Sequence, residues 1–168
     1  MYASKPRFLE LRFLDKISLP VLTGKQIKGE EDKVVRVALV DGLTGKCVTS
    51  GHEASAEVEI LVIEADFNGD SGDNWTVEEF NSKIVTEGER QRSFLSGETH
   101  FNLREGIGFM MDVRFKHTKC WMTKRELRLG ARIVDASLDT RIREAKSEPF
   151  IVEDCRNKCE SSFMYFYV

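Results

Sequence analysis

Short runs in which apolar and polar residues alternate recur along the whole chain, and they predict β-strands. In the first run, Leu9, Leu11 and Phe13 alternate with charged residues, which places the apolar side chains on one face of a strand. Runs of this kind span 8–14, 34–40, 57–63, 99–103, 107–115, 126–134 and 149–153. Turn signals such as Asp41-Gly42 separate them. This pattern predicts a mainly β protein, an antiparallel immunoglobulin-like β-sandwich with one short helix.

One segment breaks the alternation and predicts that helix. Thr76 stands three residues before Glu79, which is the spacing of a capping box, and Trp75 and Phe80 take the positions of a hydrophobic staple. Val77 and Phe80 then share the face that packs on the sandwich. The helix carries more acidic than basic residues, unlike the basic amphipathic helices that calmodulin binds. We therefore expect it to have a structural role.

Charge is unevenly distributed along the chain. The formal net charge is -3, yet the segment from Arg114 to Lys146 holds ten Lys or Arg against four Asp or Glu. Such segregation attracts and steers phosphate-bearing partners. Within it, Arg128 and Arg132 alternate with apolar residues of the predicted strand 126–134, so both point away from the core. An ordinary solvated sheet face is the simpler interpretation of the charges alone.

Length and composition indicate one domain. The chain has 168 residues with 41% hydrophobic content, close to the usual size of a domain with its own core. No stretch reaches the roughly 18 apolar residues of a membrane span, and Met1–Pro6 lacks the apolar region of a signal peptide. The four cysteines are irregularly spaced, which favours reduced thiols. We expect a soluble intracellular protein that binds no membrane.

Catalytic and zinc-binding residues are sparse. The three histidines stand in different segments without a nucleophile motif around them, so we expect no enzyme activity and no cofactor. A four-ligand zinc site would require His117 and Cys120 to converge with Cys155 and Cys159. Because neither spacing is diagnostic, we expect no metal there.

An oxygen-rich loop from Asp66 to Asp73 raises the question of calcium. Its opening matches a helix-loop-helix calcium site, but Ser71 stands where that loop needs Gly and Val77 where it needs Glu. A flexible acidic turn and a looser calcium site of the β-sandwich type remain as interpretations.

Longer stretches carry a resemblance to a known family. In order between Leu11 and Asp154, the chain reads LRFLDKISLPVLTG, KQIKGEE, VRVALVDGLTGKCVTSG, DFNGDSGDNWTVEEFNSKIV, RLGARIVD and RIREAKSEPFIVED. This ordered set resembles the plant calmodulin-binding protein 60 family over almost all of 8–154. The resemblance implies an N-terminal tail at 1–6, a DNA-binding β-sandwich domain of that family at 7–154 and a divergent C-terminal tail at 155–168.

The resemblance also implies a function. Members of the family are plant nuclear proteins, several of which regulate transcription in salicylic-acid-linked immunity, and the region resembled is associated with sequence-specific DNA binding. It implies a transcription-regulator domain in the nucleus with double-stranded DNA as its partner. Calmodulin binding by full-length relatives is placed in segments absent from this chain. On this basis the basic segment is interpreted as a phosphate-binding surface.

Ten basic residues are the predicted DNA contacts. We expect the strand pair from Lys119 to Arg132 and the segment from Arg141 to Lys146 to lie against the duplex. The arginines suited to bidentate contacts with phosphate or guanine are Arg128, Arg132, Arg141 and Arg143. The residues suited to phosphate neutralisation are Lys124, Arg125 and Lys146. Lys119, together with Arg90 and Arg92 from the loop 87–92, completes the set.

Departures from the family pattern leave two alternatives open. The sequence differs from the family at 117–126 and after Asp154, which is compatible with a shortened member of reduced activity. One alternative is a protein-interaction β-sandwich that has lost DNA contact and competes with full-length relatives. The other is a calcium- and membrane-binding β-sandwich, which would require calcium in the loop from Asp66 to Asp73.

Overall fold

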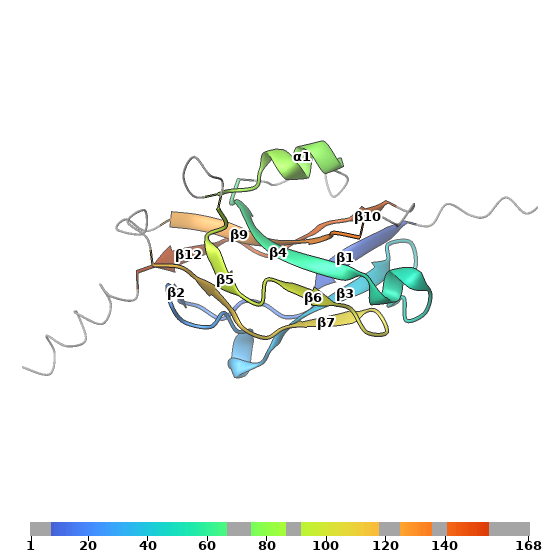
Figure 1. The fold of residues 1–168 in the computed structure, drawn as a ribbon, viewed down its shortest axis with the longest axis horizontal. Helices are drawn as coiled ribbons and strands as arrows, with labels where there is room; N and C mark the ends of the chain where they lie inside the picture. The colour runs from blue at the N-terminus through green and yellow to red at the C-terminus, as the bar shows by residue number, and fades with distance from the viewer. Residues whose placement is uncertain (1–7, 67–74, 87–91, 118–124, 136–140, 155–168) are drawn as a thin grey trace, which may run out of the picture.

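Two β-sheets packed face to face form the body of the protein (Figure 1). The computed structural model describes residues 8–66, 75–86, 92–117, 125–135 and 141–154, with Arg125 described for its backbone only. Within these ranges, no helix has the length and apolar character needed to cross a membrane.

The first sheet has four strands. In spatial order they are β10 (Ile142–Arg143), β1 (Leu9–Phe13), β3 (Val35–Asp41) and β7 (Ile107–Met110). β3 pairs antiparallel with both β1 and β7, whereas β10 pairs parallel with β1. That parallel pair joins the first described strand to one near the end of the described chain.

The second sheet has six strands. In spatial order they are β2 (Val21–Leu22), β12 (Phe150–Glu153), β9 (Arg125–Ile133), β4 (Glu57–Glu64) and β6 (His100–Asn102), and β11 (Ala145–Lys146) also pairs with β9. A separate two-stranded sheet contains β5 (Leu95–Gly97) and β8 (Val113–Phe115). Two short 3-10 helices complete the described elements, η1 (Glu30–Asp32) and η2 (His52–Ser55), together with one α-helix, α1 (Val77–Ser82).

The core between the sheets follows the alternation of the sequence. Leu9 and Leu11 in β1, and Val58, Ile60 and Val62 in β4, are each at most 2% exposed and belong to one apolar cluster. Burying such side chains removes apolar surface from water, which is the main favourable term in folding. The prediction of a mainly β sandwich with one short helix is confirmed.

The predicted continuous strand 107–115 is wrong. The chain changes sheet after Met110, so β7 belongs to the first sheet and β8 pairs with β5. At the change, the amide of Glu98 donates to the carbonyl of Asp112 at 2.7 Å. Gly97 has a φ of +93°, and a Cβ there would lie 2.0 Å from that same carbonyl oxygen. The close approach of the two backbones, which alternation does not encode, sets the break.

The strands also differ from the sequence prediction in number and direction. β2, β5, β10 and β11, each of two or three residues, were not expected. The pairs β1–β10 and β2–β12 are parallel, against the expectation of an antiparallel sandwich. Strands of two residues are too short to show a period, so only the tertiary structure reveals them.

Helix α1 covers the outer face of the second sheet (Figure 1). Its predicted cap is confirmed, because the Thr76 side chain accepts a hydrogen bond from the amide of Glu79 at 3.1 Å. Phe80 is fully buried and packs with Trp75 and two outer-face residues of β4. Val77 is 39% exposed, so its expected place on the buried face is wrong. The helix has six residues, and Val77 is its first.

Candidate nucleic-acid interface

The structure describes six of the ten predicted contact residues with their side chains. They are Arg92, Arg128, Arg132, Arg141, Arg143 and Lys146. Arg90, Lys119 and Lys124 lie outside the described residues, and the side chain of Arg125 does as well. Arg92 is exposed ahead of β5 and lines neither of the two pockets described below.

Arg128 points to the outer face of β9, as the alternation predicts, but it is buried there. The residue is 9% exposed. Its Nε donates to the carbonyl of Ala65 at 3.0 Å and its Nη1 to the carbonyl of Ser147 at 2.9 Å. Hydrogen bonds from a charged donor to buried carbonyls are among the stronger ones in proteins. Geometry therefore argues against Arg128 as a phosphate contact, because its guanidinium ties segments of the fold together.

Arg132 lies on the same face of β9 and is half-buried. Its Nε and Nη2 each contact Oε1 of Glu59 at 2.8 Å, and its Nη1 donates to Oδ1 of Asn81 at 3.2 Å. A guanidinium has five N–H groups, so one N–H on each terminal nitrogen has no acceptor among the described residues. The ion pair holds the side chain in one orientation while leaving those donors available to a ligand.

Arg141 is more fully committed to the fold. Its two terminal nitrogens form a bidentate pair with Glu144, at 2.9 Å each. The same nitrogens donate to the carbonyls of Ile142, at 2.8 Å, and Trp75, at 3.3 Å. All four terminal N–H groups are thus engaged, which leaves only the Nε–H. Glu144 is 6% exposed and also accepts from the Trp75 indole at 2.9 Å.

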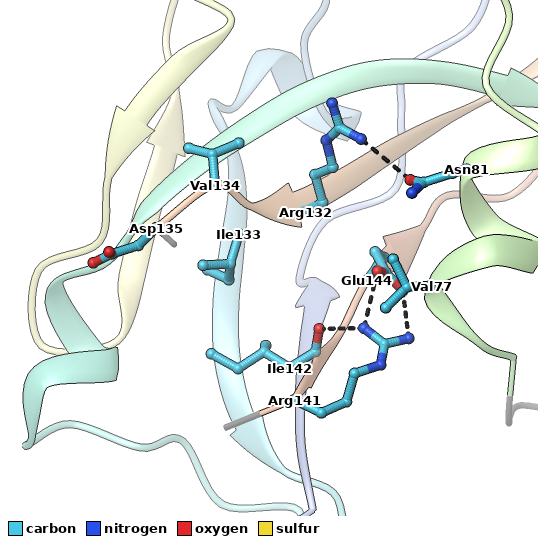
Figure 2. A pocket seen from close by; sticks show the side chains of 9 residues that line it. All are labelled: Val77, Asn81, Arg132, Ile133, Val134, Asp135, Arg141, Ile142 and Glu144. Carbon is cyan, nitrogen blue, oxygen red and sulfur yellow. Dashed lines mark hydrogen bonds and ion pairs between the residues drawn. The ribbon is translucent and has the colours of Figure 1, made fainter. Parts of the chain in front are cut away.

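Arg132 and Arg141 share an open pocket of about 360 Å³, which we call the helix pocket. Figure 2 shows Arg132 reaching towards α1 and Arg141 towards Glu144. The lining residues are Val77, Asn81, Arg132, Ile133, Val134, Asp135, Arg141, Ile142 and Glu144. The described lining contains two arginines and two carboxylates, so its ionised side chains carry no net charge. The rest of the lining is mostly apolar.

Arg143 and Lys146 gather around one aromatic ring. The guanidinium of Arg143 lies 5.0 Å from the centre of the Trp75 ring, and Nζ of Lys146 lies 5.2 Å from it. Arg143 also lies over the ring of Phe8 at 5.0 Å. Cations over aromatic faces are attracted by the ring quadrupole. Burial lowers the pKa of Arg143, and Glu144 opposes that shift.

The sequence prediction missed two residues of this cluster, Glu10 and Arg12. The parallel pair β1–β10 places Glu10 opposite Arg143. Glu10 is 3% exposed, accepts from Nε of Arg12 at 2.8 Å and forms an ion pair with Nη2 of Arg143. Both residues occupy the polar positions of an alternating run, which singles out neither of them as a ligand contact. Their pairing partner lies at the other end of the domain, so the local sequence carries no signal for it.

These residues line a second open pocket of about 310 Å³, which we call the β1–β10 pocket. Its lining residues are Glu10, Leu11, Arg12, Phe13, Trp75, Arg143, Glu144, Ala145 and Lys146. Three cations face two carboxylates here, and Glu144 is already engaged by Arg141 from the neighbouring helix pocket. Counted over the described lining residues, this pocket has more cations than carboxylates, whereas the helix pocket has equal numbers.

Histidines and metal ligands are dispersed among the described residues. Each histidine faces a carboxylate, but in three separate places: His52–Asp135 at 3.6 Å, His100–Glu59 at 3.5 Å and His117–Asp154 at 4.0 Å. The described ranges contain no group of three or more His, Cys, Asp or Glu that could hold a metal ion. Three of the candidate zinc ligands and most of the loop 66–73 lie outside those ranges. The absence of enzyme activity, cofactor and metal stays a prediction.

Comparison with known proteins establishes the family. Residues 9–155 match a family model described as the calmodulin binding protein-like N-terminal domain. The chain is 42% identical over 153 residues to calmodulin-binding protein 60 B of Arabidopsis thaliana. The chain belongs to the calmodulin-binding protein 60 family. The resemblance seen in the sequence is thereby confirmed, whereas the exact limits 7–154 of the domain stay a prediction.

Comparison with further relatives shows how much of their length this chain covers. It is 41% identical to calmodulin-binding protein 60 A and 29% identical to Protein SAR DEFICIENT 1, both of Arabidopsis thaliana. The aligned region covers 90% and 89% of this chain, respectively. It covers 24%, 30% and 33% of the 60 B, 60 A and SAR DEFICIENT 1 proteins. This family member therefore spans about a quarter to a third of the length of these relatives.

Proposed function

We propose that this chain is a sequence-specific DNA-binding domain of a plant nuclear transcription regulator in salicylic-acid-linked immune gene expression. The observation that carries the proposal is the gathering of Arg132, Arg143 and Lys146, from β9, β10 and β11, around the two neighbouring pockets. Membership of the family supports it, and so does the similarity to Protein SAR DEFICIENT 1.

The contacts separate basic residues that can bind DNA from basic residues that stabilise the fold. Arg132 is held by Glu59 and has N–H groups that no described residue accepts, so it can donate to a phosphate or to guanine at little further cost in side-chain freedom. Lys146 suits phosphate neutralisation, which depends strongly on salt concentration. Arg128 and Arg141 serve mainly to fix the surrounding backbone. Base contacts on such a surface decide sequence preference, while phosphate contacts fix its register.

A protein-interaction sandwich that competes with full-length relatives is the second candidate. The helix pocket favours it, because its ionised lining is balanced and much of the remainder is apolar, including the half-exposed Val77. Protein interfaces bury apolar centres within polar rims, whereas DNA interfaces are far more positively charged. This candidate predicts that duplex DNA is bound without sequence preference or not at all.

For full-length relatives, we infer that calmodulin binds segments other than the region aligned with this chain. Calmodulin targets are amphipathic helices with an apolar face and usually a basic character. The only α-helix among the described residues has six residues and carries Glu78 and Glu79 in its first turn. Helix α1 therefore differs from a calmodulin target in both length and charge.

Selection from randomised duplex DNA tests the proposal. The wild-type chain should enrich one motif, and Arg132→Gln should weaken binding to that motif at least severalfold. Arg114→Gln is the matched control: Arg114 belongs to the same basic stretch of sequence and is paired with Asp112 at 2.9 Å, but it lies in β8. It should bind like the wild type. If the folded chain enriches no motif, the DNA-binding proposal is rejected and the protein-interaction candidate takes its place.

A further inference from the structure

The β1–β10 pocket has the composition of an anion site. We propose that Arg12, Arg143 and Lys146 form a phosphate-binding subsite there, in which Arg12 comes from outside the basic segment of the sequence. The proposal rests on the proposed function in one respect only, since duplex DNA is the polymer expected to carry the phosphate. The subsite itself follows from the charges, donors and packing of the pocket.

Charge distinguishes the two neighbouring pockets. The helix pocket is lined by Arg132 and Arg141 together with Asp135 and Glu144, so its charge attracts a phosphate less strongly than that of the β1–β10 pocket. In the β1–β10 pocket, three cations meet Glu10 and Glu144. The bidentate contact with Arg141 also compensates Glu144 from outside that pocket. Net positive charge in a partly enclosed site attracts an anion more strongly than the same charge on an open surface.

Two arginines that line the β1–β10 pocket have N–H groups without an acceptor among the described residues. Arg12 contacts Glu10 through Nε, at 2.8 Å, and Nη2, at 2.5 Å, which leaves Nη1 for a ligand. The Arg12 side chain is 49% exposed, so a ligand can reach it. Nε of Arg143 is buried and has no hydrogen-bond acceptor within the part of the chain that the structure describes. Buried donors without an acceptor are rare, and a phosphate oxygen is a suitable acceptor.

Two residues hold the cations in place without needing to touch the anion. Glu10 is buried and binds both Arg12 and Arg143, so it keeps the two guanidinium groups beside each other. Trp75 carries both Arg143 and Lys146 against its ring. Long side chains that are already ordered lose less conformational freedom on binding. Glu10 and Trp75 are therefore positioning residues of the subsite.

The salt dependence of DNA binding tests the subsite within the full chain. Each phosphate contact contributes about 0.9 to the slope of log affinity against log salt concentration on a duplex. Lys146→Gln and Arg12→Gln should each lower the slope by about 0.9, which reduces the affinity loss between 50 and 200 mM salt about 3.5-fold. Arg36→Gln is the matched control, because Arg36 is an exposed arginine of the same sheet, paired with Asp15 outside the pocket.

Two outcomes of the salt titration overturn the subsite. One is a wild-type slope in both pocket variants; the other is an equal loss of slope in Arg36→Gln, which would show an effect of net charge alone. Arg12→Gln removes one partner of the buried Glu10, so circular dichroism must show that it folds. Lys146→Gln leaves both partners of Glu10 in place and keeps the test decisive if Arg12→Gln does not fold.

Inorganic phosphate separates the subsite from the DNA-binding proposal. In a nitrogen–proton correlation spectrum of the wild-type chain, phosphate should shift the indole signal of Trp75 saturably, since its ring forms one wall of the pocket. The shift should disappear in Lys146→Gln and persist in Arg36→Gln. A phosphate response without motif selection would keep the subsite and reject the DNA-binding function. Motif selection with no phosphate response and unchanged slopes would keep the function and reject the subsite.

Discussion

The two ends of the outer face of β9 make different use of the same residue type. At one end, Arg128 is 9% exposed and its guanidinium binds the carbonyls of Ala65 and Ser147. At the other, Arg132 is half-buried, paired with Glu59 and open to the helix pocket. Alternation along a strand assigns both arginines to one face. The neighbouring segments then decide which arginine becomes a structural cross-link and which stays accessible to a partner.

The position between the two arginines explains how closely α1 approaches the sheet. Gly130 lies midway on the same face, and a Cβ there would come within 2.9 Å of atoms of Leu61 and Phe80. The missing side chain gives the ring of Phe80 its room. The covered part of this face thus depends on a glycine, and the accessible part begins where α1 offers Asn81 to Arg132.

The largest expected loss of stability is at Arg128, at the buried end of this face. Arg128→Ala should destabilise the protein by about 3 kcal/mol, because it leaves two carbonyls without their charged donor and opens a gap. Urea denaturation measures the change. If Arg128 instead bound phosphate directly, this variant would keep its unfolding midpoint and lose only DNA affinity.

Filling the space at Gly130 should have the next largest effect. Gly130→Val should destabilise by about 2 kcal/mol, since added methyl groups in a packed cluster force neighbours aside. Gly130→Ala provides the graded control and should cost less. Thermal or urea unfolding gives the difference. Equal stability of all three proteins would show that α1 does not pack closely at this position.

Removing the cap of α1 should cause a smaller loss of stability, and the effect should be confined mainly to that helix. Thr76→Ala should cost about 1 kcal/mol, because the amide of Glu79 loses its side-chain acceptor. Thr76→Ser keeps a hydroxyl and should restore most of the stability. Amide hydrogen exchange should show faster exchange in 77–82 for the alanine variant. Unchanged exchange there would contradict a stabilising role for the cap.

The smallest effect on stability is expected at Arg132. Arg132→Gln should change the unfolding free energy by less than about 1 kcal/mol, because partly exposed ion pairs contribute little. Its effect on DNA affinity should nevertheless exceed that of Arg114→Gln. Arg128→Ala and Arg132→Gln therefore have opposite expected signatures, measured by urea denaturation and by anisotropy titration. A large loss of stability in Arg132→Gln would remove the distinction between the two ends.

Much of the fold and part of the candidate site could be predicted from the sequence. The cap at Thr76 and the apolar faces of β1 and β4 follow from local patterns, and the structure confirms them. The basic segment predicted Arg132, Arg143 and Lys146 as contact residues, and the structure places them around two neighbouring pockets. Arg12 and the burial of Arg128 could not be found in this way, since both depend on contacts between distant segments.

The family, the mainly β class and the face of the strand on which each arginine lies could all be predicted from residue order. Those properties depend on residue order and on the two-residue period of a strand, which are local. Which of those charges remain accessible depends instead on the three-dimensional fold. That outcome depends on the pairing of β1 with β10, the docking of α1 over Gly130 and the carboxylates that each guanidinium meets. A charge is neutralised or left available by its neighbours in space, and those neighbours come from distant parts of the chain.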